Sequence, residues 1–274
     1  MKLALFQSAP ADHSFERTEA LLREAAAQGA DVLVLPELFF PGYNRPDLHH
    51  AEAQAIAGAW MDDLRARVAG TGCALVFGWA ERSGSTVYNA ASCIGADGAI
   101  LSHYRKVQLF GDMERASFTA GDHLSPTFQL AGRRCGILIC YDIEFPGHAA
   151  TLARAGAEVL FVPTANPAGY EHVQDVLVPA RAHESRGFVA YANSCGAENG
   201  IQFGGGSVIA GPDGRALAQA GRDETLLIVD LPKLTDYPPE ALSMQGAEFR
   251  PAPIKSCPDK IRRFLGQGDP EKAP

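Results

Sequence analysis

One stretch of the sequence occurs twice, and this repetition limits the fold more than any other feature. Residues 29–37, Gly-Ala-Asp-Val-Leu-Val-Leu-Pro-Glu, align with residues 156–164, Gly-Ala-Glu-Val-Leu-Phe-Val-Pro-Thr. Each copy has a glycine that can end a helix, followed by an unbroken apolar run typical of a parallel strand buried on both faces. Residues 94–98 and 209–214 also align, with one residue inserted, and both contain hairpin signals. The repetition predicts two similar α/β halves, each with a mixed sheet.

The predicted elements alternate between strands and helices in both halves. In the first half, strands are expected at 3–7, 32–35, 74–79, 87–94 and 99–104, and helices at 14–28 and 56–68. In the second half, strands are expected at 136–140, 158–162 and 188–193, and helices at 148–155 and 173–184. Two such sheets packed face to face, with helices outside, would make a four-layer α-β-β-α sandwich.

A doubly wound Rossmann sheet is the alternative fold. It is disfavoured because the chain has no Gly-x-Gly-x-x-Gly, and the glycines at 204–206 do not follow a first strand. We expect one domain over residues 1–250. Residues 251–274 are rich in proline and weakly periodic, and we expect a tail that packs on the domain or on a partner subunit.

Charge and cysteine usage exclude several classes of protein. The formal net charge of −8 offers no basic surface for nucleic acid or anionic lipid. No apolar run approaches the roughly 18 residues of a membrane span, and the N-terminus lacks a signal-peptide core. The six cysteines form no Cys-x-x-Cys pair and no zinc-ligand pattern, so we expect free thiols, no metal and a cytoplasmic location.

Two reactive side chains are expected at strand ends, one in each half. Reactive groups of open α/β sheets lie beyond the carboxyl ends of parallel strands, and Glu37 and Cys140 both occupy that position. Pro146 suits the first turn of a helix, so Cys140 lies on a strand-to-helix elbow where backbone N–H groups would stabilise a thiolate or bind an oxyanion. Glu37 has apolar neighbours, which would raise its pKa toward that of a general base. A buried core cysteine and a surface carboxylate are the plain alternatives.

A third charged residue follows the predicted hairpin. Lys106 belongs to a basic pair and precedes Val107, Leu109 and Phe110, an apolar setting that is unusual for a solvated lysine. The separations between Glu37, Lys106 and Cys140 are 69 and 34 residues.

Together these motifs resemble the nitrilase superfamily of carbon–nitrogen hydrolases. The resemblance rests on Leu-Pro-Glu at 35–37 with Pro-Gly-Tyr at 41–43, Arg-Lys at 105–106, and Cys-Tyr-Asp at 140–142 before Phe-Pro at 145–146. It covers residues 1 to about 235 and implies the same four-layer fold. It further implies a homodimer or larger homo-oligomer and chemistry without a cofactor.

The resemblance also implies a role for each matched residue. Cys140 is similar to the nucleophile that forms a thioester, and Glu37 to the base that moves the protons. Lys106 resembles the cation that stabilises the oxyanion, with the backbone N–H of Tyr141 as second donor. Glu114, eight residues after Lys106, matches a second glutamate that orients the site. Tyr43 belongs to the matched motif and is expected at the substrate site.

Two further residues bear on the substrate. Glu144 stands where many members of the family have arginine, so the pocket should favour a cationic or neutral substrate over an anionic one. A structural ion pair is the alternative role for Glu144. Asn166 lies beyond the strand that matches the Glu37 strand, where it would line the substrate site or form a turn before Pro167.

The expected function is therefore hydrolysis of small aliphatic carboxamides, including those that carry an amine. The pattern around Cys140 resembles the branch of R-stereoselective amidases and 5-aminopentanamidase. A nitrilase or an N-carbamoyl hydrolase would use the same three residues and remains an alternative. A binding protein without activity on the same fold is disfavoured because all the expected residues are present. No Gly-x-Ser-x-Gly or His-Glu-x-x-His motif indicates another hydrolase class.

Overall fold

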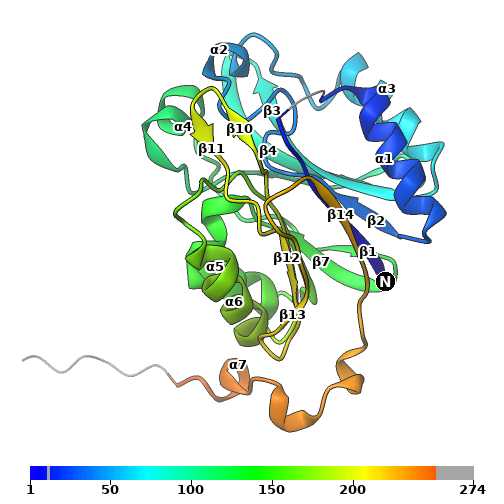
Figure 1. The fold of residues 1–274 in the computed structure, drawn as a ribbon, viewed down its shortest axis with the longest axis vertical. Helices are drawn as coiled ribbons and strands as arrows, with labels where there is room; N and C mark the ends of the chain where they lie inside the picture. The colour runs from blue at the N-terminus through cyan, green and yellow to red at the C-terminus, as the bar shows by residue number, and fades with distance from the viewer. Residues whose placement is uncertain (11–12, 251–274) are drawn as a thin grey trace, which may run out of the picture.

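Two six-stranded sheets form the centre of the structure, a computed structural model that describes residues 1–10 and 13–250 (Figure 1). The first sheet has the order β14 (Thr225–Asp230), β1 (Lys2–Gln7), β2 (Val32–Val34), β3 (Ala74–Ser83), β4 (Thr86–Ile94) and β5 (Ile100–Arg105). The second has the order β6 (Phe128–Leu130), β7 (Arg133–Ile137), β8 (Val159–Pro163), β9 (Phe188–Ala192), β12 (Val208–Ala210) and β13 (Ala216–Gln219). The tail predicted for residues 251–274 lies outside the described residues.

The two sheets have the same pattern of strand directions, which confirms the internal repeat. In the first sheet β1, β2 and β3 are parallel, and β14, β4 and β5 pair antiparallel at its sides. In the second, β7, β8 and β9 are parallel, and β6, β12 and β13 pair antiparallel. The two aligned sequence stretches contain β2 and β8, which occupy the same position in their sheets. The two aligned turns join β4 to β5 and β12 to β13.

Helices cover the outer face of each sheet, which gives the predicted four layers. Helices α1 (Phe15–Ala27) and α3 (Ala59–Ala69) lie on the first sheet, and α5 (Pro146–Arg154) and α6 (Val178–Ser185) lie on the second (Figure 1). Helix α1 begins after Ser14, whose hydroxyl caps the backbone N–H of Arg17. The two-sheet α/β sandwich is thus confirmed, and the Rossmann alternative is wrong because the strands form two sheets.

The side chains of the first sheet alternate between its two faces, and each face contributes to a separate hydrophobic core. Leu3 and Leu5 of β1 face the second sheet, whereas Ala4 and Phe6 face α1 and α3. Since successive side chains of a strand point to opposite faces, an unbroken apolar strand fills both cores at once. The core between the sheets receives Cys135 and Ile137 from β7, the strand that leads to Cys140.

Shorter elements lie outside the two sheets. They are α2 (Pro46–His49), α4 (Gly111–Ser117), the hairpin of β10 (Ala197–Glu198) and β11 (Ile201–Gln202), and α7 (Gln245–Glu248). Single 3-10 turns lie at Cys140–Glu144, Leu234–Asp236 and Pro239–Ala241, and a π turn at Val173–Leu177 leads into α6. Within the described part of the chain, no helix combines the length and apolarity that a membrane crossing requires.

Several predicted boundaries are wrong by a few residues. The strand expected at 136–140 ends at Ile137, because the chain turns into the 3-10 turn that starts at Cys140. The helix expected from residue 56 begins at Ala59, after Gly58 in an extended conformation. The strand expected to end at residue 79 continues to Ser83, because β4 pairs with it along its whole length. The edge strands β6 and β14 were not expected, and their side chains are mostly only partly buried.

The core between the sheets should dominate the free energy of unfolding. Phe161 on β8 is fully buried in this core and lies beside Phe128. Replacing Phe161 with alanine should lower the free energy of unfolding by about 3–5 kcal/mol, because it leaves a cavity between two sheets that cannot close. Urea unfolding measures this. The exposed Val176 is the control, and Val176→Ala should change stability by less than about 0.5 kcal/mol; equal losses in the two variants would contradict the assignment of this core.

Candidate active site

The predicted charged residues meet at one end of the two sheets. Glu37 lies on the loop after β2, Lys106 directly follows β5, and Glu114 lies on α4. Cys140 begins the 3-10 turn that follows β7 in the second half. The loops that follow β2 and β8 touch each other, since the backbone N–H of Glu37 donates to the carbonyl of Thr164 at 3.4 Å.

A buried chain of hydrogen bonds connects four of the predicted side chains. The Lys106 ammonium donates to Oε1 of Glu37 at 2.6 Å and to Oε1 of Glu114 at 2.7 Å. The hydroxyl of Tyr43 donates to the same oxygen of Glu114 at 2.8 Å. The side chains of Lys106, Glu37 and Glu114 are fully buried, so solvent screens these interactions little. Tyr43, expected at the substrate site, thus commits its hydroxyl to Glu114.

Glu37 has further partners that fix its carboxylate. Asn89 on β4 donates to Oε1 at 2.7 Å, and the backbone N–H of Ala165 donates to Oε2 at 3.1 Å. The loop that carries Glu37 passes so close to Gly78 on β3 that a Cβ there would lie 2.6 Å from the Glu37 Cα. Glycine at 78 is therefore required for this approach.

Burial and charge together place the pKa of Glu37 near neutrality. Burial raises it, the Lys106 ammonium lowers it, and the Glu114 carboxylate raises it, with a result of about 7. This is the direction that the apolar neighbours of Glu37 predicted. Burial alone would lower the pKa of Lys106, but Glu114 and Glu37 outweigh burial and raise it well above its usual value. The site therefore holds a permanent cation beside a carboxylate that can exchange a proton near pH 7.

Cys140 occupies a strained turn beside this cluster. Its φ of 45° lies in the left-handed region, which a non-glycine residue rarely adopts. Burial raises the pKa of its thiol, Glu37 raises it further, and Lys106 and the backbone N–H of Ala165 lower it, so that it stands well above the usual value. The thiol is therefore protonated at rest, and a neighbouring base is needed to make it a nucleophile.

Asp142 holds the turn that carries Cys140. Its Oδ2 accepts hydrogen bonds from the hydroxyl of Tyr104 at 2.8 Å and from the backbone N–H of Ile139 at 3.0 Å. Its Oδ1 accepts from the backbone N–H of Gln108 at 2.9 Å. Because Gln108 lies two residues after Lys106, the Asp142 carboxylate ties the lysine segment to the cysteine turn across the two halves.

The other predicted residues lie around this centre. Tyr141 is partly buried, and its ring contacts Phe110 at 5.2 Å and Phe145 at 4.9 Å between centroids. Glu144 is half-buried, and its carboxylate forms no hydrogen bond or ion pair within residues 1–10 and 13–250. Its pKa is raised by burial, against the effects of His172 and Lys106. Asn166 donates its amide to the carbonyl of Tyr170 and to Gln174, so this side chain orders its own loop.

Several contributors could not be found in the sequence pattern. Asn89 lies in the middle of a strand, and the backbone N–H of Ala165 has no side-chain signal at all. Asp142 was visible only as part of a motif, since two of its three donors, the Tyr104 hydroxyl and the Gln108 backbone N–H, come from the other half of the chain. Among the described residues, no group of three or more His, Cys, Asp or Glu side chains is placed to hold a metal ion.

The chain is similar in sequence to known proteins over most of its length. Residues 2–237 match the family model described as carbon-nitrogen hydrolase. A protein of Pseudomonas protegens named for its position, "Hydrolase in pqqF 5'region", is 42% identical over 92% of this chain and 90% of its own length. An (R)-stereoselective amidase of a Pseudomonas species is 35% identical over 84% of this chain and 85% of its own length.

A solved structure supplies the geometric comparison. The amidase of Nesterenkonia sp. AN1, as a Glu-to-Gln mutant with the acetamide moiety of fluoroacetamide added covalently to its active-site cysteine, has a TM-score of 0.79. It is 36% identical, and the match covers 86% of this chain and 92% of that one.

The pKa of Glu37 makes a prediction about the pH dependence of activity. A base must be ionised to accept a proton, so kcat/KM should fall as the pH drops through about 7. The hydrogen bond from Asn89 stabilises the ionised carboxylate of Glu37. Asn89→Ala should therefore raise the pKa of Glu37 and move this acidic limb to higher pH by about one unit. A pH–rate profile measures both effects. The exposed Gln129→Ala is the control and should leave the limb in place; an acidic limb near pH 4.5 in the native protein would contradict the assignment.

The carboxylate of Asp142 makes a second prediction. Asp142→Asn turns an amide N–H₂ toward groups that are all donors, and should lower the free energy of unfolding by about 1–3 kcal/mol and kcat/KM more than about tenfold. Tyr104→Phe removes a single donor and should have the smaller effect on both. Urea unfolding and steady-state kinetics provide the measurements. Native stability and activity in Asp142→Asn would show that the two segments do not need this tether.

Proposed function

The chain belongs to the carbon–nitrogen hydrolase family and is an amidase-type hydrolase of non-peptide carbon–nitrogen bonds, and on that premise we propose that Cys140, Glu37 and Lys106 hydrolyse short aliphatic carboxamides that carry an amine. The observation that carries this proposal is the buried Glu37 carboxylate, with a pKa of about 7, beside a strained cysteine and a fixed cation. A base of that pKa can take a proton in one step and return it in the next.

The first half of the reaction forms a thioester. Glu37 removes the thiol proton as the sulfur of Cys140 attacks the carbonyl carbon of the amide. The developing oxyanion is stabilised by the Lys106 ammonium and the backbone N–H of Tyr141. The carbon–nitrogen bond then breaks, Glu37 gives its proton to the nitrogen, and ammonia leaves. The acyl group remains on the Cys140 sulfur.

The second half consumes one water. Glu37, ionised again, takes a proton from water as the oxygen attacks the thioester carbon. The carbon–sulfur bond breaks, the carboxylic acid product leaves, and Cys140 recovers its proton from Glu37. Amide and water thus become acid and ammonia, and the enzyme returns to its starting state. The acetamide adduct on the cysteine of the Nesterenkonia relative supports Cys140 as the nucleophile.

Glu114 and Tyr43 serve this cycle by holding the lysine. Glu114 keeps the Lys106 ammonium directed at the site and opposes its deprotonation, and Tyr43 and the backbone N–H of Phe110 hold Glu114 through its two oxygens. Because Glu114 also repels negative charge on Glu37, it helps to raise the pKa of the base. A pKa raised in this way fits a base that must accept a proton from a thiol and later return it.

The preference for an amine rests on Glu144. Its carboxylate forms no hydrogen bond or ion pair in the described part of the chain, although His172 lies within electrostatic range, so its oxygens are available to a ligand. The Lys106 ammonium affects its pKa, which indicates that Glu144 lies within electrostatic range of the reacting groups. The ring of Phe110 contacts the rings of Tyr141 and Tyr170, and these aromatic side chains would pack on a short methylene chain. These features support a substrate with a carboxamide at one end and an ammonium group at the other.

Three substrates of similar length test the proposal by their charge. Ammonia release should be fastest from 5-aminopentanamide, slower from the neutral isostere hexanamide and slowest from glutaramate, whose carboxylate Glu144 would repel. Glu144→Gln should lower kcat/KM for 5-aminopentanamide about tenfold and change it little for hexanamide, because a half-buried charge pair is worth on the order of 1 kcal/mol. The assay is coupled detection of ammonia with purified protein.

Two controls test the active site and the substrate specificity separately. Cys140→Ala should abolish release from every substrate, and equal release from this variant would mean that the active site lies elsewhere. Faster cleavage of glutaramate than of 5-aminopentanamide would refute the role of Glu144 and leave the amidase assignment intact. Ammonia release from pentanenitrile alone would identify a nitrilase instead.

A further inference from the structure

The turn that carries Cys140 is held at its C-terminal end by an arginine from a different element. Helix α6 packs against this turn, and Nε of Arg181 on α6 donates to the backbone carbonyl of Ile143 at 3.1 Å. Nη2 of the same side chain donates to the carbonyl of Glu144, also at 3.1 Å. Ile143 and Glu144 are the last two residues of the 3-10 turn that begins at Cys140. One guanidinium therefore binds both carbonyls at the end of the cysteine turn.

These two carbonyls depend on the guanidinium because the backbone leaves them without a donor. The last carbonyls of a helical turn have no partner within the turn itself. Pro146, the first residue of α5, has no N–H, and the N–H of Phe145 donates to the carbonyl of Asp142. Within residues 1–10 and 13–250, Arg181 is therefore the one donor that reaches the last two carbonyls of the turn.

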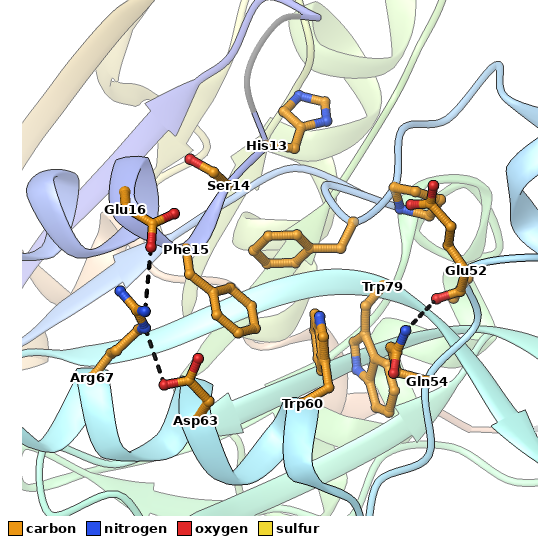
Figure 2. A pocket seen from close by; sticks show the side chains of 13 residues that line it. His13, Ser14, Phe15, Glu16, Glu52, Gln54, Trp60, Asp63, Arg67 and Trp79 are labelled. Carbon is orange, nitrogen blue, oxygen red and sulfur yellow. Dashed lines mark hydrogen bonds and ion pairs between the residues drawn. The ribbon is translucent and has the colours of Figure 1, made fainter.

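The contacts of Arg181 differ from those of an arginine in the helix layer of the first sheet. Arg67 of α3 borders a cavity on that side and binds the carboxylates of Glu16 and Asp63 at 3.2 Å each, as the dashed lines in Figure 2 show. Arg181 is only 7% exposed, and of its side-chain contacts only that from Nη1 to Glu184, at 2.9 Å, is to a carboxylate. Arg67 thus pairs charges near the surface, whereas Arg181 holds buried backbone.

We propose that Arg181 is a positioning residue for the amidase reaction, which fixes the end of the cysteine turn and thereby the place of the Cys140 sulfur. The planar guanidinium presents its N–H groups in fixed directions, so it can hold two carbonyls at once. Asp142 holds the start of the turn through the backbone N–H of Ile139. With both ends held, the backbone at Cys140 keeps its strained φ of 45°. The inference rests on Cys140 as the nucleophile of the function proposed above.

Loss of the guanidinium should slow the reaction more than it weakens substrate binding. A displacement of about 1 Å at a reacting group can lower the rate about a hundredfold. Arg181→Ala should therefore lower kcat for hexanamide at least about tenfold and change KM less than about twofold. Hexanamide is neutral, so this result does not depend on Glu144. The acidic limb of the pH–rate profile should stay in place, because the charges that most shift the pKa of Glu37 are Lys106 and Glu114.

A guanidinium ion added in solution should restore part of the lost rate. Arg181→Ala removes the equivalent of an ethylguanidinium ion, and the partner Glu184 is 40% exposed, so the vacated space lies close to solvent. Millimolar ethylguanidinium should raise kcat of this variant at least about fivefold and leave the native protein unchanged. n-Propylammonium carries the same charge without the planar group and should raise kcat less than about twofold. A merely structural role would not produce this difference.

Matched variants test charge and stability separately. Arg154→Ala on α5 removes the same charge from an exposed arginine and should leave kcat unchanged. Glu184→Gln breaks the ion pair of Arg181, keeps both carbonyl contacts and should also leave kcat near the native value. Arg181→Lys keeps the charge but not the planar donors, so its kcat should lie between those of Arg181→Ala and the native protein. Thermal unfolding of each variant sets an assay temperature at which it is folded, and Arg181→Lys carries the test if Arg181→Ala does not fold.

Three results would overturn the proposal. An unchanged kcat in Arg181→Ala, or in Arg181→Lys, would show that the cysteine turn does not need these contacts. Equal rescue by ethylguanidinium and n-propylammonium would show that only a positive charge is required. An equal loss of kcat in Glu184→Gln would show that Arg181 acts through α6 and not through the carbonyls. Activity in Cys140→Ala would instead refute the nucleophile on which the inference rests, so the two failures are distinguishable.

Discussion

The Lys106 ammonium, buried between the carboxylates of Glu37 and Glu114, is the interaction on which the rest of the site depends. A buried cation is costly unless it is paired, and here it is paired twice. Two carboxylates and one ammonium leave an excess negative charge in a region shielded from water. Burial of the Glu37 carboxylate raises its pKa, the Lys106 ammonium lowers it and the Glu114 carboxylate raises it, so that the pKa lies at about 7 and not near that of a free carboxyl group. The buried groups that hold Lys106 in place therefore also set the pKa of Glu37.

The fold positions this cluster by joining segments that are distant in the sequence. Glu37 arrives from β2, Lys106 from β5 and Glu114 from α4, and the cysteine turn comes from the other half of the chain. The tether through Asp142 holds the turn in place, and the left-handed backbone at Cys140 is tolerated because several hydrogen bonds determine it. The hydrogen bonds that keep this turn rigid therefore also hold the backbone of Cys140 in its strained conformation.

The features of the fold and the site that depend on a local sequence pattern could be predicted from the sequence. The aligned stretches around β2 and β8 predicted two equivalent halves, because an apolar run after a helix-ending glycine has few other interpretations. Glu37 and Lys106 could be singled out because charged groups in apolar surroundings are unusual. Asn89, the backbone N–H of Ala165 and the donors to Asp142 could not, since their roles arise only when separate strands come together. The end of β7 was misplaced for a related reason: the apolar run continues through Ile139, while the backbone leaves the sheet at Ile137.

The two halves repeat each other in shape but not in chemistry. Thr164 holds in the second half the place that Glu37 holds in the first, and Cys140 follows the first parallel strand of its sheet whereas Glu37 follows the second. Neither half alone therefore contains a working set of groups. In the proposed mechanism Cys140 and Glu37 act together, so the chain can be reactive only when its two sheets are docked against each other. An ancestral duplication would explain the matching frames, and the later divergence of their strand ends would explain why the molecule has a single centre of this kind in the part of the chain described.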